Sequence, residues 1–232
     1  MLRAQAELIA SLAPAIDGAE ARRRIASGQV AYNAHSALAA CGDVRPAFQR
    51  ILHAFELAGF VSNEDSAAIH SAPVDLPALM TAWLAGDRLP RAGRKRIARE
   101  AAGVVANAAL RAATAEVGPA STWRKWTRLV CPCCGSAPDI GLLERGAQRT
   151  LVCSRCDAEW RAARAGCLGC ESGELASVVR IANPQLGYDL VICNNCGRFL
   201  KERPRRGSEA TLVERAITAE LDLAAEQRGL RI

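Results

Sequence analysis

Aromatic residues and long apolar runs are both scarce in this chain. Aromatic side chains make up 4% of its 232 residues, whereas alanine is abundant and half of the residues are hydrophobic. This composition favours packed helices over a β-sandwich, and the length allows one large core or two small ones. No apolar run approaches the roughly 20 residues that span a bilayer, so no transmembrane helix is expected.

The common catalytic motifs are also missing. We find no Gly-rich phosphate loop, no Ser/His/Asp arrangement and no carboxylate pair with an evident geometry. The three histidines, His35, His53 and His70, have no partner at a metal-ligand spacing and are interpreted as ordinary helix residues. The sequence therefore predicts a protein that is not an enzyme.

The first fifteen residues make a poor export signal. They carry one arginine, then Glu7 inside the apolar part, then Pro14, a pattern better explained by a short amphipathic helix. We therefore expect a cytoplasmic protein, in a compartment where reduced thiols favour metal binding over disulfides.

Cysteine, in contrast, is plentiful and regularly spaced. Eight of the ten cysteines form four Cys-x-x-Cys pairs, which are Cys131/Cys134, Cys153/Cys156, Cys167/Cys170 and Cys193/Cys196. Two residues between cysteines let the chain turn so that both sulfurs face one point, and two such knuckles complete a tetrahedron. Four pairs therefore predict two metal sites with four sulfurs each.

The spacing between the pairs indicates which of them join. Eighteen residues separate the first two pairs and twenty-two the last two, enough in each case for a hairpin that returns one knuckle to the other. The ten residues between Cys156 and Cys167 are too few for this. One site is thus assigned to Cys131, Cys134, Cys153 and Cys156, and the other to Cys167, Cys170, Cys193 and Cys196.

A closed four-thiolate site leaves no open position for water or substrate, so neither site is expected to be hydrolytic. Zinc there would be structural, whereas iron in the same cage would resemble rubredoxin and could pass one electron. The sequence does not decide between zinc and iron.

Two cysteines fall outside the four pairs. Cys41 is interpreted as a small hydrophobic residue. Cys133 is interpreted as a bystander that binds no metal, with a spare ligand or a reactive thiol as the alternative.

The formal charge of +6 invites a nucleic-acid interpretation. Eight thiolates add eight negative charges and two divalent ions add four positive ones, which leaves a net charge of about +2. Metal loading therefore removes most of the apparent basicity. The basic cluster from Arg91 to Arg99 is interpreted as a solvated helix face, with a binding patch as the alternative.

Residues 1 to about 127 have helical patterns. Helices are predicted over Ala19–Ala40, from Pro46 to Gly59, from Asp75 to Gly86, over Ala92–Val117, and at the C-terminus from Ser208 to about Gln227. From Cys131 the pattern changes to short strands and turns. Strands are expected over Ile140–Glu144, Arg149–Cys153, Glu159–Arg161, Ser177–Ile181 and Tyr188–Cys193.

These elements predict an α+β fold. A helical domain (1–128) precedes two tandem rubredoxin-like or zinc-ribbon modules (129–165 and 166–202). A basic linker, Arg-Pro-Arg-Arg-Gly at 203–207, then leads to a C-terminal helix that packs back on the body (203–232).

The knuckles and their surroundings resemble one protein family. The sequence Cys-Pro-Cys-Cys-Gly-Ser-Ala-Pro from Cys131, the Glu-Trp-Arg-Ala-Ala-Arg segment from Glu159, and Cys-Asn-Asn-Cys-Gly-Arg-Phe-Leu-Lys from Cys193 are similar to FdhE-type formate dehydrogenase accessory proteins. The likeness extends over most of the chain and is strongest in its last 100 residues.

The resemblance implies a cytoplasmic maturation factor that binds the catalytic subunit of a respiratory formate dehydrogenase, a molybdenum or tungsten enzyme that is exported folded. It also implies that the eight paired cysteines hold two metal ions, iron or zinc. The partner contact is expected near Trp160, Arg161 and Arg164. Two alternatives stay open: a zinc-ribbon nucleic-acid binder, with Trp160, Tyr188 and Phe199 as a thin stacking surface, and a small electron carrier.

Overall fold

The computed structural model describes residues 16–86, 93–144, 148–162, 167, 169–170, 177–205 and 211–232. Two compact units make up the chain. One is helical and comprises residues up to Ala21 together with Tyr32–Gly118, and the other comprises Arg22–Ala31 and Pro119–Ile232. No described helix combines the length and the apolar character needed to cross a membrane.

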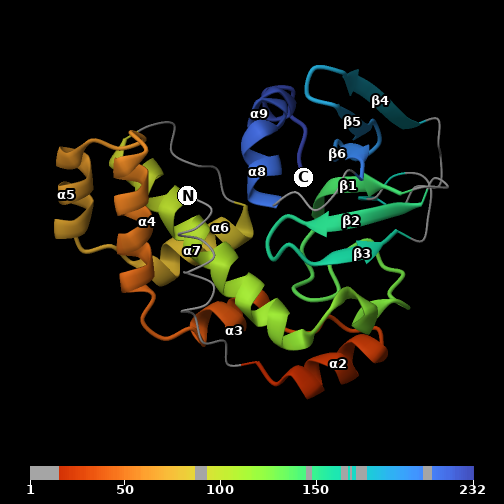
Figure 1. Ribbon diagram of the computed structural model, residues 1–232, viewed down its shortest axis with the longest axis horizontal. Helices are drawn as coiled ribbons and strands as arrows, with labels where there is room; N and C mark the ends of the chain where they lie inside the picture. The colour runs from red at the N-terminus through yellow and green to blue at the C-terminus, as the bar shows by residue number, and fades with distance from the viewer. Residues whose placement is uncertain are drawn as a thin grey trace. The chain divides into compact units, whose positions relative to one another are not determined.

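The helical unit is centred on its longest helix. Its helices are α3 (Ala34–Ala39), α4 (Arg45–Leu57), α5 (Asn63–Ser71), α6 (Leu76–Ala85) and α7 (Arg94–Val117). Helices α3, α4, α5 and α6 all contact α7, which Figure 1 shows as the long yellow-green helix. Its alanine-rich middle is buried, with Ala101, Ala102 and Leu110 fully enclosed, because small side chains let neighbouring helices approach closely.

Polar caps and glycines set the helix ends. The Asp75 carboxylate accepts the Ala78 N–H at 3.0 Å, and Gly86 ends α6 with φ +70°, as the sequence pattern predicts. The single helix predicted over Ala19–Ala40 is wrong. Two helices occupy it, α2 (Gly18–Ala26) and α3, because Gly28 takes φ +80° and Asn33 starts α3 by capping the Ser36 N–H.

Helix α5 has a clear start signal that the sequence analysis missed. The Ser62 hydroxyl accepts the Asp65 N–H at 3.1 Å, and acidic residues fill the first turn. The helix expected before Ala15 and the basic residue Arg91 lie outside the described residues.

The second unit is built on one six-stranded sheet. Its strands are β1 (Pro138–Leu143), β2 (Arg149–Cys153), β3 (Glu159–Arg161), β4 (Val178–Asn183), β5 (Tyr188–Cys193) and β6 (Phe199–Pro204). Their order is β3-β2-β1-β6-β5-β4, and every pair is antiparallel except β1 with β6 (Figure 1). The two predicted hairpin modules are therefore present, and the parallel β1–β6 pairing joins them into one sheet. The predicted α+β fold class is confirmed.

A fully buried carboxylate lies at the junction of the two hairpins. Glu202 on β6 is 0% exposed, and its carboxylate forms ion pairs with Arg149 of β2, at 2.5 Å, and with Arg180 of β4. Gly141 of β1 faces the same carboxylate, and a Cβ there would lie 2.9 Å from Glu202 Cγ. The absence of a side chain at Gly141 and the ion pairs of Glu202 thus allow β1 and β6 to lie side by side, which joins the two modules in one sheet.

The opposite face of the sheet is covered by α8 (Thr211–Ile217) and α9 (Ala219–Gln227). Lys201 forms an ion pair with Asp222 at 2.7 Å, Arg203 pairs with Glu214, and Ala225 packs against Ile192 and Phe199. The predicted single helix is divided at Thr218, and its expected start at Ser208 lies outside the described residues. Residues 203 and 204 belong to strand β6 and not to a linker, because Arg203 is held by a buried ion pair.

Residues 22–31 and 119–128 both contribute to this second unit. The Ala31 N–H donates to the Pro132 carbonyl at 2.9 Å, and Arg128 donates to the Gly28 carbonyl at 3.2 Å. The short helix η1 (Ala120–Trp123) contacts β3. The division between the units thus falls at Gly118–Pro119 and not at residue 128.

Candidate metal centres

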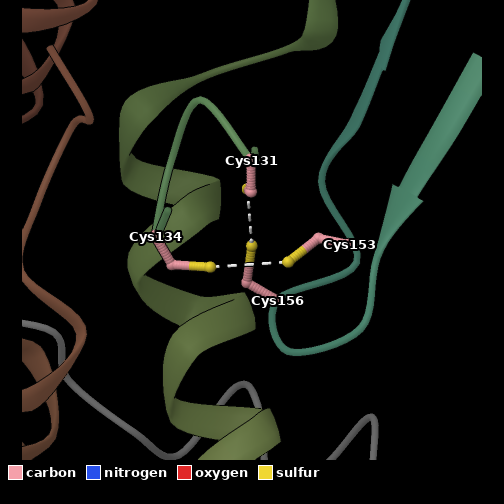
Figure 2. Close-up of side chains that lie close together, drawn as sticks. All are labelled: Cys131, Cys134, Cys153 and Cys156. Atoms are coloured by element: carbon pink, nitrogen blue, oxygen red, sulfur yellow. Dashed lines mark hydrogen bonds between the residues drawn. The ribbon is translucent and has the colours of Figure 1, made fainter. Parts of the chain in front are cut away.

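The first predicted set of cysteines converges on one point. Cys131 and Cys134 come from the loop before β1, Cys153 ends β2 and Cys156 lies in the turn that follows, with their side chains directed toward one another (Figure 2). The Cys131 and Cys156 sulfurs are 3.5 Å apart, and those of Cys134 and Cys153 are 3.4 Å apart. All four residues are buried.

The second set converges in the same way. Cys167 Sγ lies 3.5 Å from Cys196 Sγ, and Cys170 Sγ lies 3.8 Å from Cys193 Sγ. Within each set, the sulfurs all lie within 4.8 Å of one another. This second cluster is more open, because Cys170 is exposed and Cys196 half-buried.

Three of the four knuckles turn through the residue that follows their second cysteine. Gly135 and Gly197 take φ of +78° and +67°, a conformation that glycine adopts without steric cost. Asp157 takes φ 58° after Cys156, the only described non-glycine residue with a positive φ. The sequence pattern therefore indicates the turn correctly at three of the four knuckles; the fourth, at Glu171, lies outside the described residues.

Backbone N–H groups point at the sulfurs from inside the knuckles. Cys131 accepts from the N–H of Cys133 at 3.3 Å, Cys153 from Arg155 at 3.4 Å, and Cys167 from Gly169 at 3.1 Å. In each case the donor is two residues after the acceptor. Such donors stabilise negative charge on sulfur, which is what a thiolate ligand requires.

The donor set fits a tetrahedral metal ion. A metal–sulfur bond of about 2.3 Å places tetrahedral sulfurs about 3.8 Å apart, close to the separations found in both clusters. All eight donors are soft sulfurs, which suits zinc or iron and disfavours magnesium or calcium. Both clusters can therefore hold a metal ion, and neither leaves a ligand position for substrate.

Within each cluster, the pKa values of some thiols are raised and the pKa of one thiol is lowered. Hydrogen bonding from Cys131 and its neighbours holds the pKa of Cys134 well below its ordinary value, whereas burial raises the pKa values of Cys131 and Cys153. In the second cluster, burial raises the pKa of Cys167 to about 12. Burial also opposes ionisation of Cys193, but backbone N–H groups, led by that of Cys196, lower its pKa to about 6. Cys134 and Cys193 thus ionise most readily among the thiols with shifted pKa values, and metal binding to the clusters releases protons.

Arginines lie beside both clusters. Arg155 is near Cys153, and burial lowers the pKa of its guanidinium. Arg215 of α8 donates to the Cys153 carbonyl at 2.7 Å and to the carboxylates of Asp139 and Asp157, contacts that sequence analysis missed because they join residues 58 to 76 positions apart. Arg198 packs its side chain against Gly169 in the second cluster. Lys201, which follows the second cluster in the sequence, forms an ion pair with Asp222.

The remaining cysteines lie outside the two sulfur sets. Cys133 is fully buried, but its sulfur is not among the four that converge. The Cys41 thiol donates to the Ala37 carbonyl at 3.2 Å, and burial raises its pKa. The three histidines are exposed on helices of the helical unit, and His53 faces Glu56 at 3.3 Å.

The residues expected at a partner contact have different surroundings. Trp160 is 3% exposed and donates its indole N–H to the Arg128 carbonyl at 3.2 Å. Arg161 is exposed on β3, and Arg164 lies outside the described residues. Tyr188 and Phe199 are also buried, so the three aromatic rings considered for base stacking are not displayed at the surface.

Comparison with known proteins bears on this site directly. A model of the FdhE central domain matches residues 130–164, which contain the whole first cluster and strands β1 to β3. The chain resembles FdhE. Relatives include a protein FdhE homolog from Edwardsiella ictaluri, 32% identical over 108 residues, which are 44% of this chain and 35% of that one. Another, from Stutzerimonas stutzeri, is 32% identical over 77 residues, which are 32% of this chain and 25% of the relative.

The likeness in fold extends further than the likeness in sequence. The crystal structure of the FdhE protein from Pseudomonas aeruginosa matches with a TM-score of 0.65 at 22% identity, covering 99% of this chain and 82% of that one. The matched sequence segments span about a third or less of the curated relatives' length. The resemblance inferred from the knuckles is thus confirmed.

Proposed function

We propose that this chain is a metal-binding accessory protein for the maturation of a respiratory formate dehydrogenase. It binds the catalytic subunit of that enzyme in the cytoplasm, before export, and does not itself turn over formate. The observation that carries the proposal is the first four-sulfur cluster, which lies inside the segment that matches the FdhE central domain.

Each cluster holds one ion, either iron or zinc. Cys131, Cys134, Cys153 and Cys156 are the ligands of the first, and Cys167, Cys170, Cys193 and Cys196 of the second. Zinc fixes the hairpins, and iron also supplies a one-electron couple. The chain's own contribution is to supply four thiolates, donate N–H groups to them, and exclude water from the first cluster.

A role as an accessory protein fits the chemistry of these sites. Four protein sulfurs fill a tetrahedral coordination sphere, so a substrate would have to displace a thiolate to reach the ion. A surface shaped by metal, or an electron passed to the client, needs no such displacement. Buried aromatic rings argue against the nucleic-acid alternative, because base stacking requires an exposed ring face.

The test is capture of the client together with a genetic readout. The tagged chain, co-expressed with the catalytic subunit of its host's formate dehydrogenase, is expected to retain that subunit, and a deletion strain is expected to lose formate dehydrogenase activity. Full activity in the deletion strain with no detectable complex would overturn the proposal and point to a different metalloenzyme client.

A further inference from the structure

A polar pocket lies beside strand β3, away from both sulfur clusters. It has a volume of 220 Å³ and lies between η1, β2, β3 and the end of β6. Its lining includes three arginines and one glutamate, namely Arg124, Arg161, Arg205 and Glu159, as well as two tryptophans, Trp123 and Trp160. The pocket is smaller than the roughly 300 Å³ at which small-molecule sites begin, so it suits a side chain better than a metabolite.

The floor of the pocket is held in place by internal contacts. Arg205 donates to Glu144 at 2.6 Å and to Glu159 at 2.7 Å, which fixes its planar guanidinium. Trp123 donates its indole N–H to the Glu159 carbonyl at 2.7 Å. Trp123 and Trp160 are both buried, so the walls are formed by side chains that are already packed in place.

Two of the arginines at the pocket are available for a ligand. Arg124 follows η1 directly, Arg161 ends β3, and both are exposed. Within the described part of the chain, no carboxylate lies in ion-pair distance of either one, whereas Arg205 is already paired twice. An arginine fork matches the geometry of a carboxylate and binds it through two parallel hydrogen bonds.

We propose that this pocket receives a glutamate or aspartate side chain from an acidic segment of a bound protein. Arg124 and Arg161 hold its carboxylate, while the apolar parts of Trp123 and Trp160 enclose its stem. That the segment belongs to the formate dehydrogenase subunit rests on the function proposed above. The recognition of a carboxylate rests only on the pocket.

The charge of the pocket favours a carboxylate over a phosphate. Glu159 and Glu144 already neutralise Arg205, so the net positive charge left at the site is small and suits a monoanion that the fork of an arginine can hold. Both indole N–H groups are already used by backbone carbonyls, and both rings are buried, so no base can stack there. An acidic peptide side chain satisfies the arginines without either conflict.

A peptide titration tests the pocket itself. The full chain is titrated calorimetrically at low salt with a blocked hexaglutamate peptide, a blocked hexaglutamine peptide and inorganic phosphate. We expect saturable binding of hexaglutamate alone, weakened about tenfold by either Arg124→Gln or Arg161→Gln. Lys125→Gln is the matched control, because Lys125 is exposed beside Arg124 but does not line the pocket, and it should change the affinity by no more than about twofold.

Three results would overturn the inference: equal binding of hexaglutamine, full competition by phosphate, or unchanged affinity in the two arginine variants. A client arm then separates this inference from the proposed function. If the parent chain captures the catalytic subunit and the double arginine variant captures it equally well, the pocket is not the contact, although the accessory role stands. If the parent chain captures nothing, the accessory role fails and the peptide titration still decides the pocket.

Discussion

Arg215 on helix α8 lies 2.5 Å from the carboxylate of Asp157, the residue that turns the knuckle directly after Cys156. The same guanidinium donates to Asp139 at 2.7 Å and to the Cys153 carbonyl at 2.7 Å. A residue of helix α8 thus fixes the second knuckle of the first cluster. Metal affinity at that cluster and the docking of α8 are therefore expected to be linked.

Replacing Arg215 by alanine should weaken both the docking of α8 and the binding of metal at the first cluster. Removing one partner of a buried charge network costs about 3 kcal/mol, because Asp139 and Asp157 are left as buried carboxylates without their cation. Loss of contacts that orient ligand residues typically weakens metal binding by about tenfold or more. Competition with a chelator should show faster loss of one ion from Arg215→Ala, and the second ion should be retained as in the parent chain.

Arg228→Ala is the matched control for this experiment. Arg228 follows α9 and is exposed, and among contacts within the described residues its guanidinium donates only to the Ala224 carbonyl, one turn before it. Its loss should leave both ions and the unfolding temperature unchanged. Equal behaviour of the two alanine variants would refute the link between α8 and the first cluster.

The Asp139–Arg215 pair also predicts a pH dependence. Burial opposes ionisation of Asp139, but the charge of Arg215 outweighs it and lowers the pKa of the carboxyl. A carboxylate whose pKa is lowered by folding stabilises the protein above its unfolded pKa of about 3.9, and that stabilisation is lost as the pH falls through the folded value. Asp139→Asn should therefore be less stable than the parent from pH 7 to about pH 5, with a difference that shrinks below about pH 4. Chemical unfolding at each pH measures this difference, and a constant one down to pH 3 would contradict it.

The local parts of the fold could be read from the sequence because their signals are local. The Cys-x-x-Cys spacing and the residues after the second cysteines predict the knuckles and hairpins without knowledge of distant contacts. Pro77 and Gly86 likewise mark the limits of α6. Misassignments occurred where a capping signal was overlooked, as at Asn33 and Ser62.

The contacts that join these parts could not be read in the same way. The parallel pairing of β1 with β6 and the ion pairs of Glu202 with Arg149 and Arg180 connect residues 22 to about 60 positions apart. A buried glutamate looks like any surface glutamate in a sequence, since only its surroundings determine its burial. Arg215 is indistinguishable from a solvated helix residue for the same reason.

Serine variants of the cysteines should separate ligands from bystanders. Cys131→Ser and Cys193→Ser should each lose one ion, whereas Cys133→Ser and Cys41→Ser should keep both, as elemental analysis would show. Since β1 pairs with β6, losing either ion should also raise hydrogen exchange in the neighbouring hairpin, while α7 stays protected. Loss of the helical circular dichroism signal together with the metal would instead show that the two units unfold as one.

Gly141 should be intolerant of a side chain. A Cβ at this position of β1 would lie 2.9 Å from Glu202 Cγ and 3.0 Å from Leu200 Cδ2. Both of these neighbours are on β6, the strand that pairs with β1 and so joins the two hairpins. Overpacking of this kind costs about 1–3 kcal/mol, so Gly141→Ala should lower the stability of the sheet unit in chemical unfolding. A variant as stable as the parent would mean that the β1–β6 junction is looser than the structure indicates.

Native mass spectrometry of the chain co-expressed with the catalytic subunit of its host's formate dehydrogenase tests the central claim most directly. One spectrum reports both the metal content and the complex. The account predicts a complex of the chain with that subunit, in which the chain carries two metal ions and no disulfides. A chain that carries no metal and is found only by itself would contradict it.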